Sequence, residues 1–489
     1  MNKVISCTHN STGQPFPSTH PHLFKNQPTA LAVGGFDHTD FEERRMNFAK
    51  HMRDDSVAFI QSADKHLMTN DIPYPFRQNS DFYYMTGFKE PGSCLVIEKR
   101  DKNNINYTLF VPPKNDNKER WDGARTGAEK VQEVLKINSA PSKDTFALFT
   151  KRYDSIYFDP SLSMYNQKKD MNYKLRELIH NVNQDQQGTK LISHRNIMDH
   201  LRKIKSNKEI TILEKAAEIS SHAFKAAMRI SKQGISEGHI EAIMEFEARL
   251  RGAQRLGYPP VVASGNRANI IHYVFNDQQL QNQDMLLVDA GCEYHNYSSD
   301  ITRTWPVSGT FSQPQKIIYS AVLRIQKDCI QGLQNGSFNT MRELQTFAQE
   351  RTMQEVVNFG GLIGRSIFSN QSLIHEIAQL LCPHSIGHPM GMDIHENKPE
   401  FYDALEPGMV ITVEPGIYIP SELTEDTRLP DEWKQKNMFG IGVRIEDNVL
   451  ILPNKTAKVL THQTPKEIEE IEHVMNTKNS NQDLYGDLA

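Results

Sequence analysis

The sequence predicts a mixed α/β protein, with α+β character, that is divided into two domains. The chain has 489 residues, and a single hydrophobic core usually stops growing well below that length. Between about residues 38 and 180, strand-like apolar runs alternate with helical stretches, which is typical of an α/β domain. The last third is rich in strand-like runs such as "GMVITVEPGIYI" and "GIGVRIEDNVLIL". These three observations favour an α/β domain followed by a second domain of helices and strands.

The boundary between the domains is expected in "HNVNQDQQGTK", residues 180–190, because this segment is polar and interrupted by glycine. The first residues look irregular, and the last stretch, "MNTKNSNQDLYGDLA", has the composition of a disordered tail. We therefore divide the chain into an irregular segment (1–37), an N-terminal domain (38–185), a second domain (200–472) and a tail (475–489).

Periodicity predicts the main elements of each domain. In the N-terminal domain, "FEERRMNFAKHM" predicts a helix, and strands are predicted by "SVAFIQ", "SCLVIEK", "YTLFVPP" and "SIYFDP". The second domain opens with a capping box from Ser206 to Glu209, and apolar residues continue at helical spacing to Gly234. Further helices are expected between Ser236 and Gly252 and over residues 313–333.

Composition narrows the class of protein. The net charge of -5 is small for this length, so we expect no nucleic-acid partner. No apolar run reaches the roughly eighteen residues of a membrane span, so no membrane partner is expected. The five cysteines are scattered and form no C-x-x-C pair, which suits a reducing compartment. The first 36 residues carry neither an acid nor an arginine, so a mitochondrial presequence and a cytosolic protein with a loose N-terminus both remain open.

A predicted hairpin carries the first chemical signal. Two strand-like runs, 285–288 and 301–307, flank polar turn material. A turn centred between Tyr294 and His295 would place Asp289 directly opposite Asp300, with Cβ atoms roughly 4.5–5.5 Å apart. Opposed carboxylates destabilise a sheet unless a cation lies between them. On the hairpin alone, two acids that face solvent or serve as turn residues are the simpler interpretation.

Further polar residues in apolar surroundings favour a bound cation over solvent-facing acids. "CPHSIGHPMGMDIHE" contains three histidines on a backbone that Gly and Pro should keep extended or looped. Glu414 ends one apolar strand, and Glu446 lies in another, where an ion pair with Arg444 is the alternative. Buried acids are rare unless they are paired or bound to metal. Four carboxylates with one imidazole favour hard divalent ions such as Mn²⁺, and two ions rather than one; such a pair supports metal-assisted hydrolysis.

The order Asp-x10-Asp, His, Glu, Glu resembles the pita-bread metallopeptidases. Within that family the chain is similar to the Xaa-Pro aminopeptidases (aminopeptidase P), and most similar to their eukaryotic mitochondrial form. The resemblance covers roughly residues 19–470 and rests on the stretches "THPHL", "NDIPYPFRQNSDFYYMTGFKEP", "RWDGARTG", "YPPVVASGNRANIIHY", "SSDITRTWPVSGTF", "HSIGHPMGMDIHE" and "GIGVRIEDNVLI". It implies an N-terminal creatinase-like α/β domain followed by a pita-bread catalytic domain.

The resemblance also implies roles for individual residues. The metal ligands would be Asp289, Asp300, His388, Glu414 and Glu446, with Asp300 and Glu446 bridging two divalent ions. Glu414 would also be the acid–base group, and His272 and His395 would contact the scissile peptide. Tyr258, His384 and Arg444 match positions of the substrate pocket, and Ser385 stands where relatives often carry Gly or another small residue.

The expected activity is hydrolysis of the N-terminal Xaa-Pro bond of peptides or proteins by a homodimeric enzyme. A prolidase acting on Xaa-Pro dipeptides is the nearest alternative, because it uses the same ligands. A non-catalytic pita-bread binding module is disfavoured because all five ligands are present. We expect a mitochondrial protein, with the cytosol as the alternative.

Overall fold

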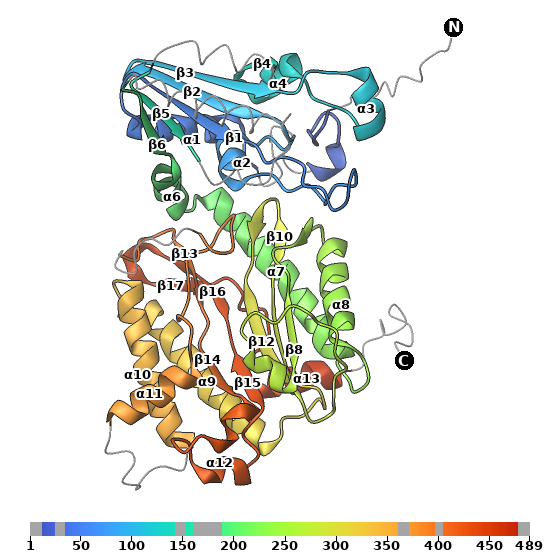
Figure 1. The fold of residues 1–489 in the computed structure, drawn as a ribbon, viewed down its shortest axis with the longest axis vertical. Helices are drawn as coiled ribbons and strands as arrows, with labels where there is room; N and C mark the ends of the chain where they lie inside the picture. Colours follow the sequence, from blue (N-terminus) through green and yellow to red (C-terminus); the bar gives the residue numbers. More distant parts are fainter. Residues whose placement is uncertain are drawn as a thin grey trace. The chain divides into compact units, whose positions relative to one another are not determined.

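The computed structural model describes residues 12–24, 35–141, 153–159, 188–359, 371–396 and 404–477. Contacts divide the chain into two compact units, Met1–Arg202 and Lys203–Ala489 (Figure 1). Most of the expected boundary segment, 180–187, and most of the expected tail lie outside the described residues. Part of the N-terminal segment is ordered: it contains the short 3-10 helix Pro21–Leu23, and Phe16 and Phe24 are buried.

The first unit is built on a six-stranded mixed sheet in the order β4-β3-β2-β1-β5-β6. Its central strand, β1, pairs antiparallel with β2 and parallel with β5. The strands are Ser56–Gln61 (β1), Cys94–Asp101 (β2), Asn104–Val111 (β3), Asn138–Pro141 (β4), Ser155–Phe158 (β5) and Lys190–Ser193 (β6). The helices are His38–His51 (α1), Ser80–Thr86 (α2), Asp116–Asp122 (α3), Ala128–Leu135 (α4) and Arg195–Lys203 (α6). The predicted helix and the four predicted strands of this unit are therefore confirmed.

The second unit combines small sheets with long helices. Three sheets have three strands each, in the orders β11-β10-β7, β12-β9-β8 and β13-β16-β17, and β14 pairs with β15. The strands are Arg255–Leu256 (β7), Val261–Ser264 (β8), Met285–Ala290 (β9), Cys292–Tyr294 (β10), Tyr297–Ser298 (β11), Ile301–Pro306 (β12), Val410–Val413 (β13), Gly416–Ile419 (β14), Ile441–Arg444 (β15), Asp447–Ile451 (β16) and Ala457–Val459 (β17). The helices are Asn207–Ile230 (α7), Glu237–Leu250 (α8), Gln313–Gln334 (α9), Met341–Phe359 (α10), Gln371–Leu381 (α11), Asp431–Gln435 (α12) and Ile468–Asn476 (α13).

The three helices predicted for this unit, α7, α8 and α9, begin where the sequence predicts. The hydroxyl of Ser206 accepts from the Glu209 N–H at 3.3 Å, and the Glu209 carboxylate accepts from the Ser206 N–H at 2.9 Å, which completes the capping box of α7. Ser236 is the N-cap of α8. Helices α7, α8 and α9 share one continuous apolar core with strands β8, β9, β12, β13, β14, β15 and β16. Figure 1 shows these elements gathered in the second unit. No described helix is long and apolar enough to cross a membrane.

The predicted register of the hairpin is wrong by two residues. Asp289 pairs with Thr302, and further along the hairpin Glu293 pairs with Ser298. The cause is a tight two-residue turn at His295 and Asn296, whose φ angles are 50° and 67°, as a type I′ hairpin turn requires. Side chains alternate with a period of two, so a two-residue shift leaves both acids on one face of the sheet.

The histidine-rich segment 382–396 is looped, as its Gly and Pro content predicts, and it contains no helix. It lies beside β13, to which it is joined by a bridge between Pro389 and Ile411. This pairing brings the loop to the sheets that carry the acidic residues.

Candidate metal centre and cavity

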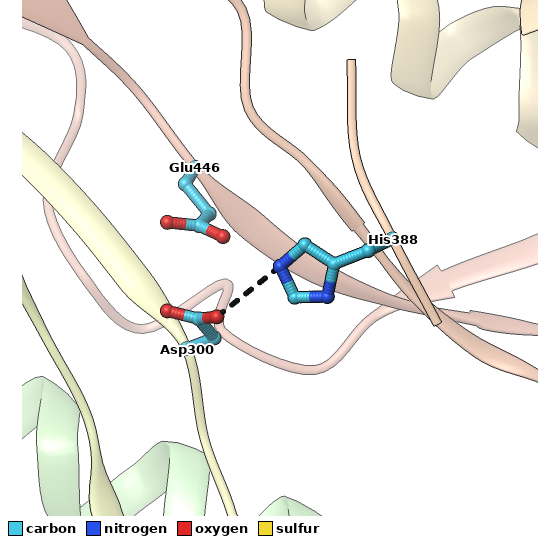
Figure 2. A group of neighbouring side chains, drawn as sticks. All are labelled: Asp300, His388 and Glu446. Atoms are coloured by element: carbon cyan, nitrogen blue, oxygen red, sulfur yellow. Dashed lines mark ion pairs between the residues drawn. The ribbon is translucent and has the colours of Figure 1, made fainter. Parts of the chain in front are cut away.

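Five segments of the second unit bring the predicted ligands together. The positions are Asp289 in β9, Asp300 directly before β12, His388 in the loop beside β13, Glu414 directly after β13, and Glu446 between β15 and β16. Figure 2 shows Asp300, His388 and Glu446 converging, and each offers a ligand atom within 4.8 Å of the others. The Nε2 atom of His388 lies 3.5 Å from Asp300 Oδ2 and 3.5 Å from Glu414 Oε1.

Backbone pairing with β13 positions His388 and Glu414. The Thr412 N–H donates to the His388 carbonyl at 2.9 Å, and the His388 N–H donates to Thr412 Oγ1 at 2.9 Å. A Cβ at Gly387 would lie 2.0 Å from the Thr412 carbonyl oxygen, so the loop and β13 approach this closely only with glycine there. Thr412 Oγ1 also donates to Glu414 Oε1 at 3.0 Å. One threonine therefore orients two predicted ligands.

Glu446 is held by β12. Its N–H donates to the Thr302 carbonyl at 3.0 Å, and its Oε2 accepts from Thr302 Oγ1 at 2.6 Å. The wholly buried Arg303 donates to the Glu446 carbonyl at 2.6 Å and to Asp447 Oδ1 at 2.7 Å. Main chain and side chain of Glu446 are thus both fixed by neighbours on one strand.

Asp289 and Asp300 share a partner. The hydroxyl oxygen of Tyr258 lies 2.5 Å from the Oδ1 atom of each carboxylate. The guanidinium of Arg444 donates to Asp289 Oδ2 at 2.6 Å. The alternative ion pair of Arg444 with Glu446 is therefore not the contact that forms: Arg444 pairs with Asp289.

All ten predicted site residues line one cavity of about 540 Å³ in the second unit. The ten are Tyr258, His272, Asp289, Asp300, His384, His388, His395, Glu414, Arg444 and Glu446. The rings of His388 and His395 meet edge to face, with centroids 4.3 Å apart. His384 Nε2 lies 2.7 Å from the Tyr418 hydroxyl, which accepts from Arg444 at 2.8 Å. His272 lies on an exposed loop at the cavity.

Burial and mutual repulsion make the carboxylate cluster costly to ionise. Burial raises the pKa of Glu414 to about 7. The charges of Asp300 and Asp289 also raise this pKa, whereas the charges of His388 and Arg444 lower it. Burial, with the charges of Asp300, Glu414 and Asp289, also raises the pKa of Glu446 well above its usual range. The charged groups that oppose this repulsion include Arg444 and His388. Burial lowers the pKa of His388, but the hydrogen bond to Asp300 and the charge of Glu414 outweigh burial and raise this pKa to about 9.

This donor set fits divalent cations. Four carboxylates and one imidazole are the oxygen-rich, hard ligands that Mn²⁺ and similar ions prefer. All five line one cavity, Asp300, His388 and Glu446 converge within it, and the excess of negative charge there is what bound cations would neutralise. The ligands are also backed by threonine hydroxyls and by Tyr258, which is typical of a metal site with an ordered outer shell.

A buried centre of this kind, in a mixed α/β domain that follows an α/β N-terminal unit in the sequence, is typical of a two-domain metallohydrolase. Residues 211–453 match metallopeptidase family M24, and residues 41–155 match the aminopeptidase P N-terminal domain. The chain belongs to the Xaa-Pro aminopeptidases of metallopeptidase family M24, and it is a metallo-aminopeptidase. The family resemblance and the fold class predicted from sequence are therefore confirmed, and the family implies divalent metal ions.

Individual relatives span nearly the whole chain. Xaa-Pro aminopeptidase 3 of Rattus norvegicus is 35% identical over 478 residues, which cover 94% of this chain and 90% of that protein. Intermediate cleaving peptidase 55, mitochondrial, of Arabidopsis thaliana is 35% identical and covers 95% of this chain and 87% of its own length. Among solved structures, zinc-substituted Escherichia coli aminopeptidase P in complex with product has a TM-score of 0.80 at 31% identity, covering 91% of this chain and 100% of that one.

Sequence reasoning missed the residues that support the ligands. Thr302, Thr412, Tyr418 and Asn448 were not singled out, although Asn448 Oδ1 accepts from the Asp300 N–H at 3.0 Å. A signal existed for Thr302, Thr412 and Asn448, because each stands two positions from a predicted ligand and so shares its face of the strand. Tyr418 has no predicted ligand two positions away, and it acts across the fold on His384 and Arg444.

Proposed function

We propose that the enzyme holds two divalent ions, with Mn²⁺ as the assigned metal, and hydrolyses the N-terminal Xaa-Pro bond of peptides or proteins, releasing the first residue. The observation that carries this proposal is the convergence of four carboxylates and His388 in one cavity with three further histidines. Asp289, Asp300, His388, Glu414 and Glu446 would hold the ions, with Asp300 and Glu446 between them. Bound metals of this kind polarise a carbonyl and make water acidic enough to attack it.

The remaining residues have proposed roles around that chemistry. Glu414, oriented by Thr412, would accept the proton of the attacking water and pass it to the departing nitrogen. His272 and His395 would contact the scissile peptide, and Tyr258, His384 and Arg444 would shape the pocket. An Xaa-Pro bond lacks an N–H. Recognition through the carbonyl and the free amino terminus therefore suits it.

Peptide cleavage with metal control tests the proposal. The purified chain is expected to release arginine from Arg-Pro-Pro, to lose that activity on chelation, and to regain it with Mn²⁺. Activity confined to Xaa-Pro dipeptides would instead identify a prolidase. No release from any peptide with proline second, with Mn²⁺ bound, would refute the proposal.

We also propose that the enzyme is a homodimer located in mitochondria. The location is supported by the mitochondrial relative in Arabidopsis thaliana and by the acid-free first 36 residues. Sedimentation of the purified chain tests the dimer. Fusing residues 1–40 to a fluorescent reporter tests the location: a diffuse cytosolic signal, with the native protein absent from purified mitochondria, would overturn it.

A further inference from the structure

The loop between β8 and β9 exposes three apolar side chains within six residues. Ile270 is 55% exposed, Val274 is 48% exposed and Phe275 is 80% exposed. We call these three side chains the rim surface. A single exposed apolar residue needs no explanation, but a cluster of them marks an interaction site.

A buried carboxylate holds this loop in place. Glu237, at the start of α8, is wholly buried and accepts from the Ser264 N–H (2.9 Å), Arg267 Nε (2.9 Å), the Tyr273 hydroxyl (2.9 Å) and the Gln278 N–H (3.1 Å). These donors lie at both ends and in the middle of the loop. Burying a charge is costly unless it is paired and hydrogen-bonded in this way. The carboxylate thus fixes the loop that carries the rim surface.

Asn276 provides a second anchor directly after Phe275. Its φ of 51° is the left-handed conformation, and its side chain accepts from the Val262 N–H at 3.0 Å and donates to the Pro260 carbonyl at 3.0 Å. The ring of Phe275 lies 6.1 Å from that of Tyr273, which is itself bonded to Glu237. The exposure of Phe275 is therefore built into a fixed backbone and does not come from a frayed loop end.

The rim surface is continuous with the cavity. Ile271, His272 and Val274 line the cavity, and Val274 is half exposed and stands directly before Phe275. A volume of about 540 Å³ is in the range that encloses a drug-sized ligand. A longer substrate whose first residues reach the metal centre must therefore continue beyond the cavity.

We propose that the rim surface binds the part of a peptide substrate that follows the proline, and that it favours apolar residues at the third to fifth positions. This inference rests on the proposed function. The occupant is a substrate chain because the surface joins the cavity in which the substrate's first residues would lie. Apolar side chains on the peptide would cover Phe275 and Val274 and remove their apolar area from water.

Two pentapeptides of equal length test the preference. Binding and cleavage of Arg-Pro-Ala-Leu-Phe and Arg-Pro-Ala-Ser-Ser are measured by calorimetry and by product release, with Arg-Pro-Pro as the test of basic activity. The variant is Phe275→Ser. The matched control is Leu250→Ser, since Leu250 is 66% exposed at the end of α8 and does not line the cavity.

Covering about 50 Å² of apolar surface corresponds to roughly tenfold tighter binding. The native chain is therefore expected to bind the apolar pentapeptide several-fold more tightly than the serine-containing one. The Phe275→Ser variant should bind the two peptides with similar affinity, and the Leu250→Ser variant should keep the native preference. Equal binding of the two peptides by the native chain would overturn the inference. So would a Phe275→Ser variant that keeps the peptide preference but sediments as a smaller species, because the surface would then join two copies of the chain. A failure to cleave Arg-Pro-Pro contradicts the proposed function but not the binding preference, because calorimetry still measures the affinity for the two pentapeptides when no cleavage occurs.

Discussion

Replacing Thr302 with valine isolates one contact behind the proposed metal centre. Thr302 is wholly buried in β12, donates to Glu446 Oε2 at 2.6 Å and accepts from Arg444 Nε at 3.1 Å. Valine has nearly the same shape, so it removes the hydroxyl without opening a cavity. The carboxylate of Glu446 must be ionised to hold a cation. In the valine variant this ionised carboxylate would lack the hydroxyl donor of Thr302.

The size of the effect follows from these contacts. A hydrogen bond to a charged group contributes about 1.5–3 kcal/mol. Loss of the bond to Glu446 would therefore weaken metal binding by roughly 10- to 150-fold, which overlaps the roughly 10- to 100-fold cost of removing an outer-shell partner. The loss of the Arg444 donor contact adds destabilisation that does not depend on metal.

Calorimetric titration of the metal-free protein with Mn²⁺ measures the loss of affinity. Thr302→Ser is the matched control, because serine keeps the hydroxyl and loses only a methyl group. Thermal unfolding of the metal-free proteins checks that both variants fold. If Thr302→Val bound Mn²⁺ as tightly as the native chain, the hydroxyl would not orient Glu446 and our account of this contact would be wrong.

Three further substitutions test neighbouring parts of the site. Asp300→Asn is expected to abolish metal-dependent turnover in a chain that still folds by circular dichroism, because the ligands act as a unit; near-normal activity would contradict the dinuclear centre. Glu414→Gln keeps an oxygen ligand but removes the base, so metal should remain at least partly bound while kcat falls by about 10²- to 10⁴-fold; unchanged kcat at full metal content would remove Glu414 from that role. Glu237→Gln is expected to cost roughly 1–3 kcal/mol of stability and to speed hydrogen exchange at the Ser264 and Gln278 amides, which donate to that carboxylate; unchanged exchange would show that the carboxylate does not fix the loop.

Local pattern was sufficient to predict α1, the long helices α7 to α9 and several strands. Capping signals at Ser206 and Ser236 mark the starts of α7 and α8, because a cap is a short-range interaction between residues three apart. Alternation and apolar runs likewise located β1, β2, β3 and β5. These features depend on neighbours in sequence, so a single chain reveals them.

The register of the hairpin could not be predicted in the same way. It depends on which two residues adopt positive φ, and His295 and Asn296 carry a weaker signal than the Asn-Gly or Asp-Gly pairs of such turns. The expected neighbourhood of Asp289 and Asp300 nevertheless survived, because an error of two residues preserves the face of a strand. An error of one residue would have separated them.

Two adjacent acids show what sequence alone leaves undecided. Glu446 and Asp447 both lie in an apolar stretch, and alternation directs their side chains to opposite faces. Burial opposes ionisation of Asp447, but the charges of Arg303 and Lys466, at 2.7 and 2.6 Å, outweigh it and lower its pKa. Glu446 instead faces other carboxylates, and burial together with their charge raises its pKa well above the usual range. Asp447 receives its positive charge from side chains of the fold, whereas the proposed cations would supply it to Glu446. This difference between two neighbours assigns Asp447 to the structure and Glu446 to the proposed chemistry.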